Sequence, residues 1–64
     1  MIKKGIVTSK SNGKCRVLIK DQNYETGLLD LGQHISYEEL NIDDNVVVAF
    51  YDEQQTRGAV ISKI

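Results

Sequence analysis

The chain has 64 residues, eight of them basic and nine acidic, and carries a net charge of −1. A chain of this length forms one domain with a marginal core, so we assign residues 1–64 to a single domain. The single cysteine, Cys15, excludes an internal disulfide, and the single histidine, His34, excludes a Cys/His cluster for zinc. No segment approaches the roughly 20 apolar residues of a membrane span, and the basic excess typical of nucleic-acid-binding proteins is absent.

The first half of the chain predicts three strands, at residues 6–8, 15–20 and 24–29, with turns at 12–13 and 21–23. Asn12-Gly13 is a strong hairpin signal because both residues tolerate positive φ. In the second strand, alternation places Cys15, Val17 and Ile19 on one face. These features favour consecutive antiparallel hairpins.

The second half predicts strands at residues 46–51 and 57–64, preceded by a longer connection at 30–45 between strands three and four. Within this connection, Ser36 and Glu39 have the spacing of a capping box, which predicts about one helical turn. Five strands predict an all-β fold, a small antiparallel barrel that is OB-like (oligonucleotide/oligosaccharide-binding) or, as the alternative, SH3-like. Closure into a barrel removes the strand edges that a short chain has no other means to protect.

One predicted strand, residues 46–51, is apolar on both faces. We expect Val46, Val48 and Phe50 to fill the barrel interior, because Phe50 supplies the largest volume. The opposite face joins other apolar side chains in a candidate protein interface, which comprises Leu18, Leu28, Leu29, Val47, Ala49 and Tyr51. Soluble monomers seldom leave such a patch uncovered, so we expect either a partner chain or the 30–45 connection to cover it.

The polar residues form no constellation that supports catalysis or metal binding. Cys15 is expected to be buried and unreactive, like other structural thiols, and His34 to lie on a surface loop. Asp43 and Asp44 lack the spacing of a calcium loop and are interpreted as turn formers. We therefore assign no catalytic, cofactor-binding or metal-binding residue, and we expect a protein that is not an enzyme and needs no cofactor.

A nucleic-acid-binding module is the alternative function. Such barrels stack bases on exposed aromatic side chains beside basic residues, and the first three strands could supply Lys10, Lys14, Arg16, Lys20 and Tyr24. The net charge of −1 and the presence of only one Phe and three Tyr argue against this function. Lysines on small sheets commonly protect strand edges instead, so we do not expect nucleic acid as a partner.

Short motifs in a characteristic order run over most of the chain. They are Gly5-Ile6-Val7, Arg16-Val17 after the first hairpin, Thr26 with Leu29, Asp43-Asp44-Asn45 leading into Val46–Phe50, and Arg57-Gly58-Ala59-Val60. In this order, over residues 5–64, they resemble the OB domain of phage baseplate and tail-spike proteins of the gpV type. Two features depart from that family: Asp43 stands in place of a glycine, and the tryptophan and proline common near the exit of strand three are missing.

The resemblance implies a structural role. It implies a stand-alone small barrel that serves as a hub, adaptor or spike-base component of a phage tail, a prophage tail or a related injection particle. Its partners would be other tail and baseplate proteins and further copies of itself, assembled as rings and often as trimers. The family supplies no catalytic residue, and no membrane partner is expected. The protein would reside in the host cytoplasm during virion assembly and afterwards in the virion or tail-like particle.

Overall fold

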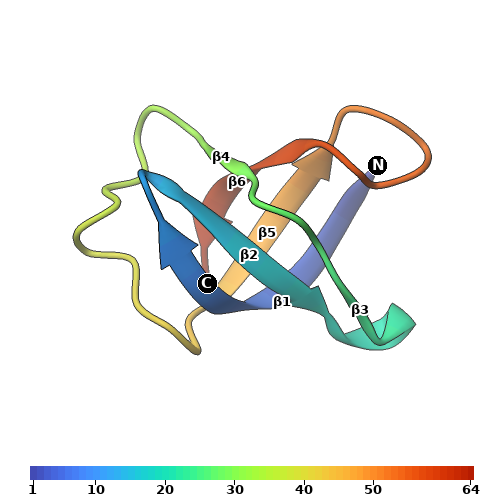
Figure 1. Ribbon diagram of the computed structural model, residues 1–64, viewed down its shortest axis with the longest axis horizontal. Coiled ribbons are helices and arrows are strands. Elements are labelled where there is room, and N and C mark those ends of the chain that lie inside the picture. Colours follow the sequence, from blue (N-terminus) through green and yellow to red (C-terminus); the bar gives the residue numbers. More distant parts are fainter.

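Six strands form one curled sheet in the computed structural model, which describes residues 1–64 (Figure 1). They are β1 (Ile2–Ser11), β2 (Lys14–Ile19), β3 (Tyr24–Glu25), β4 (Asp30–Leu31), β5 (Asn45–Phe50) and β6 (Gly58–Lys63), with a short 3₁₀ helix, η1 (Lys20–Gln22), after β2. The strand order is β3-β2-β1-β5-β6-β4. All neighbouring strands are antiparallel except β4 and β6, so the sheet is mixed and forms a half-barrel. No helix is long and apolar enough to cross a membrane.

The predicted all-β class is confirmed, but the prediction of five antiparallel strands is wrong, because residues 24–31 pass from one edge of the sheet to the other. β3 pairs with β2, Leu29 forms an isolated bridge with Cys15 of β2, and β4 runs parallel to β6. Between them, the backbone N–H of Val17 donates to Thr26 Oγ1 (3.1 Å) in place of a strand carbonyl. The side chain thus replaces a ladder bond and interrupts the predicted strand. The parallel contact arises where the same segment reaches β6.

β1 is longer than the predicted strand at 6–8 and is shared by two neighbours. Its residues 2–6 pair with β5, and its residues from Ile6 onward pair with β2. A register shift after Val7 marks a β-bulge, which bends the strand between its two partners. The start of this strand was not predicted because Lys3 and Lys4 have a low propensity for β-structure. Pairing with β5 overrides this propensity.

The first predicted turn is confirmed in detail, and the second takes a different form. Asn12 and Gly13 both have positive φ, 52° and 79°, which suits the twist of a two-residue hairpin. The turn predicted at 21–23 is formed by the end of η1 and by its C-terminal cap, Asn23, which lies in the left-handed region with φ of 49°. Both turns return the chain antiparallel, as predicted.

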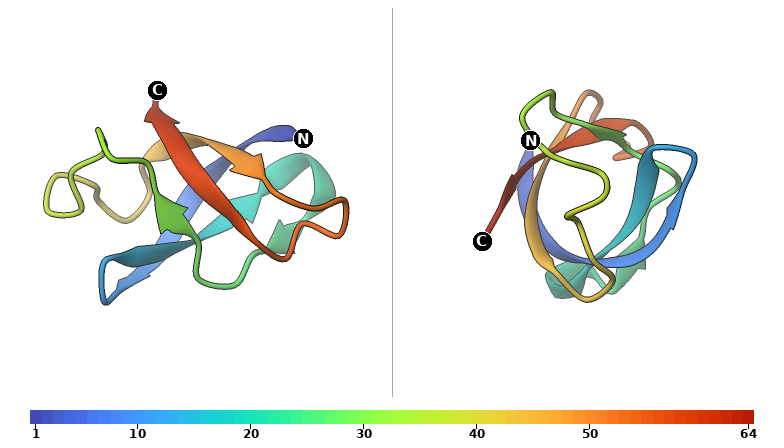
Figure 2. Two further views of the ribbon diagram at one scale, coloured as in Figure 1. Left: turned by 90° about the horizontal axis from the view of Figure 1, so that it is seen from above. Right: turned by 90° about the vertical axis from the view of Figure 1, so that its left-hand side faces the viewer.

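The 32–44 connection lies across one end of the half-barrel, and the 51–57 loop lies at the opposite end (Figure 2). Leu40, in this connection, is fully buried and closes its end of the core. The backbone N–H of Leu40 donates to the carbonyl oxygen of Ser36 (3.1 Å), which holds a single turn. The side-chain hydrogen bonds of the predicted capping box, between Ser36 and Glu39, are not formed: both residues bond through backbone atoms.

The core consists of apolar side chains from β1, β2, β5 and β6, from Leu29 between β3 and β4, and from the long connection. Its ten buried members are Val7, Cys15, Val17, Ile19, Leu29, Leu40, Val46, Val48, Phe50 and Val60. The inward orientation predicted for Val46, Val48 and Phe50 is confirmed. β5 therefore supplies three side chains to the core, as β2 does, and its alternate residues lie on the outer face of the half-barrel.

Candidate protein-interaction site

Two of the predicted interface residues lie on the outer face of β5. Val47 and Ala49 are half-buried there, while the alternate residues of β5 point into the core. Across the pairing of β1 with β5, Val47 is opposite Lys4 and Ala49 is opposite Ile2. This part of the candidate interface is therefore a two-strand ladder on the outer side of the sheet.

The other four predicted interface residues are distributed differently. Leu29 is only 1% exposed and belongs to the core, so its assignment to an interface is wrong. Its bridge to Cys15 holds it against β2, where its side chain joins the buried cluster. Leu28 and Tyr51 are exposed at a separate small pocket, and Leu18 is half-buried on β2. The six residues do not form one continuous patch.

Exposed apolar residues that the sequence analysis missed extend the ladder. Ile2 is 60% exposed and Ile64 is 71% exposed. Ile6 is half-buried and shares the outer face of β1 with Ile2 and Lys4, since alternate residues of a strand face the same way. The alternation of Ile2, Lys4 and Ile6 was the available signal in the sequence, but Ile2 and Lys4 precede the strand that was predicted to begin at residue 6.

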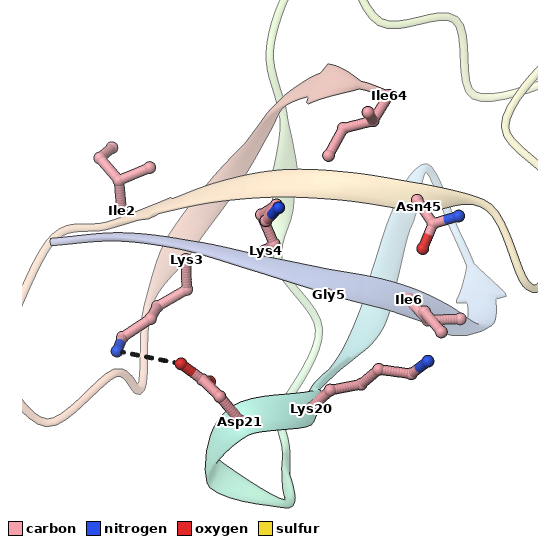
Figure 3. A pocket seen from close by; sticks show the side chains of 9 residues that line it. All are labelled: Ile2, Lys3, Lys4, Gly5, Ile6, Lys20, Asp21, Asn45 and Ile64. Carbon is pink, nitrogen blue, oxygen red and sulfur yellow. Dashed lines mark ion pairs between the residues drawn. The ribbon is translucent and has the colours of Figure 1, made fainter.

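These residues line an open groove of about 570 Å³, here called the β1 groove (Figure 3). Its lining consists of Ile2, Lys3, Lys4, Gly5, Ile6, Lys20, Asp21, Asn45 and Ile64. Figure 3 shows Ile64 and Asn45 on one side of β1, and Lys20 and Asp21 of η1 on the other side. The groove therefore follows β1 along its outer face and its edge.

The charge of the side chains in the β1 groove is predominantly positive, with three lysines and one aspartate. Lys3 and Asp21 form an ion pair, with Nζ and Oδ2 3.7 Å apart. Lys4 and Lys20 take part in none of the three ion pairs of the structure. The groove thus places two unpaired ammonium groups beside exposed isoleucines, in a chain with a net charge of −1.

A second, smaller pocket of about 310 Å³ contains a polar network around Asp30. Lys14 Nζ donates to Asp30 Oδ1 (3.0 Å), and Tyr51 Oη donates to Asp30 Oδ2 (3.3 Å). The hydrogen bond and charge of Lys14 lower the pKa of Asp30. Desolvation and the charge of Asp30 raise the pKa of Tyr51. Both shifts favour the protonation states that these groups already have at neutral pH, and the hydrogen bond to Asp30 orients the Tyr51 hydroxyl.

Two of the four basic residues predicted for a nucleic-acid surface, Lys10 and Lys14, are engaged elsewhere, whereas Arg16 and Lys20 take part in no ion pair. Lys10 Nζ lies 4.4 Å from the centroid of the Tyr37 ring, and Lys14 is paired with Asp30. Tyr24 packs against the core, and its Oη donates to the carbonyl oxygen of Gln55 (3.0 Å), so its ring does not form an open stacking platform.

Cys15 and His34 occupy the environments predicted for them. Cys15 is fully buried, and desolvation raises the pKa of its thiol, which disfavours the reactive thiolate. His34 is exposed in the long connection, and its Nε2 lies 2.7 Å from the carbonyl oxygen of Ile61. His34 therefore ties the connection to β6.

Asp43 and Asp44 form a turn, as predicted. Asp43 has a φ of 77°, in the left-handed region that aspartate tolerates. The Asp44 carboxylate accepts a hydrogen bond from the backbone N–H of Asn41 (2.8 Å) and pairs with Lys63 (3.2 Å). The bond from Asn41 is the main cause of the lowered pKa of Asp44. No three His, Cys, Asp or Glu side chains are grouped so that they could hold a metal ion.

Comparison of the sequence with protein-family models and with curated proteins finds no match. The candidate site is accordingly defined by its own geometry: a partly exposed, mainly apolar ladder on β1 and β5, and a groove beside it that carries unpaired lysines.

Proposed function

We propose that this protein is a structural assembly module, a hub, adaptor or spike-base component of a phage tail, baseplate or phage-derived injection particle. The observation that carries the proposal is the uncovered apolar face along β1 and β5. Ile2 and Ile64 are largely exposed there, and the 32–44 connection lies across the end of the half-barrel rather than over them. A soluble protein seldom leaves such a face open, and a partner chain is the simplest cover. In this function the protein binds copies of itself and other tail proteins, and catalyses no reaction.

The order of strand pairing supports an OB-like barrel as the scaffold of this function. β1 pairs with β2 and β5, β5 pairs with β6, and residues 24–31 contact β2 at one end and β6 at the other. Counted as one interrupted strand, these residues would supply the fifth strand of a partly open barrel, which is compatible with the OB type. The parallel contact of β4 with β6 favours the OB-like over the SH3-like alternative, because SH3-like barrels are antiparallel.

The genomic position of the coding sequence tests the particle to which the module belongs. The proposal expects neighbouring genes for tail-tube, tape-measure or baseplate proteins, and expects the protein in purified tail particles at a stoichiometry fixed by their symmetry. A coding sequence among unrelated cellular genes, together with absence of the protein from purified particles, would contradict a tail function.

One observation favours the alternative, a nucleic-acid-binding module: Lys4 and Lys20 are unpaired in the β1 groove. The groove contains no aromatic side chain on which a base could stack. Retention on heparin or single-stranded DNA at low salt distinguishes the two functions. We expect no tight binding, and a sub-micromolar dissociation constant for a short oligonucleotide at physiological salt would favour the alternative.

A further inference from the structure

The first half of β1 has an edge that no strand of the chain occupies. Residues 2–6 pair with β5, but the pairing of β1 with β2 begins only at Ile6. The direction of the backbone groups follows from their hydrogen bonds. The N–H of Phe50 donates to the carbonyl oxygen of Met1 (2.8 Å), and the N–H of Val7 donates to that of Asp44 (3.0 Å). Met1 and Val7 thus face the β5 side of the strand.

Alternate residues of a strand direct their backbone groups to opposite edges. Since Met1 and Val7 face β5, the N–H and C=O groups of Ile2 and Lys4 point to the other edge. The β1 groove follows this edge and separates it from η1 (Figure 3). An extended chain that entered the groove would therefore meet backbone donors and acceptors in the register of a β-ladder.

The side chains of the groove define the chemistry of such a chain. On the outer face, the sequence of side chains along β1 is Ile2, Lys4 and Ile6, an unpaired cation between two apolar groups. Cross-strand neighbours of opposite charge, and apolar neighbours, stabilise a pair of strands. The complementary strand carries an acidic residue opposite Lys4 and apolar residues two positions away on either side. Lys20, also unpaired, adds to the preference for acidic groups.

The same lysines disfavour a second copy of this chain at this edge. Antiparallel pairing of two β1 edges about a twofold axis would bring Lys3 and Lys4 of one chain close to the same residues of the other. Like charges opposite one another destabilise a ladder, and lysines on an edge commonly prevent such self-pairing. Charge therefore selects a different, acidic strand.

We infer that the free edge of β1 accepts an extended segment of another protein as an added strand, with an acidic residue opposite Lys4 and apolar residues toward Ile2 and Ile6. This inference rests on the proposed function, because both treat this surface as an interface with other chains. It names the partner as an acidic, alternating β-segment, and it assigns recognition to the edge of β1 and not to the apolar face alone.

The test uses the full chain and two capped heptapeptides, Gly-Ile-Thr-Glu-Thr-Ile-Gly and the same peptide with Lys in place of Glu. NMR titration is combined with amide hydrogen exchange. We expect the Glu peptide to bind saturably, to shift the amide signals of β1, and to slow exchange of the Lys4 amide, because that N–H gains an acceptor. The Lys peptide is expected to bind about fivefold or more weakly, since it places like charges opposite one another.

Charge reversal provides the matched variants. Lys4→Glu is expected to reverse the preference between the two peptides, so that the Lys peptide binds more tightly than the Glu peptide. Arg16→Glu, a reversal at an exposed position of β2 outside the groove, is expected to change neither affinity. Circular dichroism of both variants verifies the fold.

Three outcomes would overturn the inference: no saturable binding of the Glu peptide, binding without protection of the Lys4 amide, or binding that Lys4→Glu leaves unchanged. Tighter binding of a single-stranded DNA oligonucleotide at the same residues would also overturn it, in favour of a polyanion site. Failure of the proposed function can be distinguished from failure of this inference. Absence of the protein from tail particles would contradict the proposed function, but it would not change strand binding by the isolated chain.

Discussion

Gly5 of β1 lies directly against Val17 of β2, so closely that a Cβ atom on Gly5 would be 2.4 Å from Val17 Cγ1. It would also lie 2.6 Å from the carbonyl oxygen of Leu18, a backbone atom that has little freedom to move. This close approach occurs where β1 passes from its pairing with β5 to its pairing with β2. Only glycine allows the two strands to cross at this distance.

Substitution Gly5→Ala is therefore expected to destabilise the fold by about 2–3 kcal/mol, the upper part of the range for overpacking. The measurement is urea unfolding followed by circular dichroism. Gly27→Ala is the matched control, because a Cβ on Gly27 meets nothing within 4 Å. Equal stability of the two variants would show that the crossing of β1 and β2 is not as tight as described.

The hydrogen bond from Tyr24 Oη to the carbonyl oxygen of Gln55 (3.0 Å) connects β3 to the 51–57 loop. Gln55 is only 7% exposed, so water has limited access to this residue. Tyr24→Phe should cost about 1–2 kcal/mol of unfolding free energy, because it leaves a poorly solvated acceptor without a partner. Tyr37→Phe is the control, because the structure shows no hydrogen bond from its hydroxyl and the substitution keeps the ring next to Lys10. Equal melting temperatures of the two variants would contradict this role of Tyr24.

We expect three aspartates to lower the free energy of unfolding as the pH falls into the acid range. Lys14 lowers the pKa of Asp30, the backbone N–H of Asn41 lowers that of Asp44, and hydrogen bonds from Thr56 lower that of Asp52. A lowered folded pKa means that the unfolded chain binds protons first as the pH falls. The stabilisation is thus complete above the unfolded pKa, about 4. It is lost as the pH falls through the lowered folded values.

Thermal unfolding, measured from roughly pH 6 to pH 2, follows the stability across the range in which aspartates titrate. Asp52→Asn should have a shallower loss of stability in this range than the wild type, because one titrating carboxylate is removed. Glu53→Gln, at a neighbouring position whose carboxylate makes no hydrogen bond or ion pair in the structure, should retain the wild-type slope. A common slope for all three proteins would refute the assignment for Asp52.

Cys15 is expected to resist thiol reagents in the folded protein. Its side chain is fully buried, and burial raises the pKa of the thiol, so both access and thiolate formation are suppressed. The rate of reaction with a chromogenic disulfide reagent should be at least about tenfold lower in buffer than in denaturant, since reaction requires opening of the structure. Similar rates in the two solvents would indicate an open site.

Local signals in the sequence predict the parts of the fold that depend on local chemistry. Asn12-Gly13 specifies its turn through positive φ, and the alternation around Val46 and Val48 specifies the inner face of β5. The parallel pairing of β4 with β6 is not local, because it depends on where residues 24–31 arrive after Thr26 interrupts the strand. Such an arrival point depends on tertiary contacts, which a short apolar run does not encode.

The candidate site was predictable only in part, for a related reason. Val47 and Ala49 were found because their strand is apolar on both faces. Ile2 was missed because Lys3 and Lys4 make its surroundings polar, so the strand was predicted to begin only at residue 6, and pairing with β5 extends it back to Ile2. Leu29 was misplaced because the sequence did not define its orientation, which depends on its bridge to Cys15 of β2.

We propose that the outer face of β1 and β5 is an interface for assembly, and sedimentation velocity of the wild type and of Val47→Asp distinguishes an oligomer from a monomer. Val47 is half-buried at the middle of this face, so a charge there should disrupt association while circular dichroism remains that of a folded protein. Ser11→Asp, an exposed position at the far end of β1, is the control. We expect the wild type and the control to sediment as an oligomer at high concentration, and the Val47→Asp variant to sediment as a folded monomer. A wild type that remains monomeric at high concentration, with unchanged behaviour in Val47→Asp, would contradict self-assembly through this face.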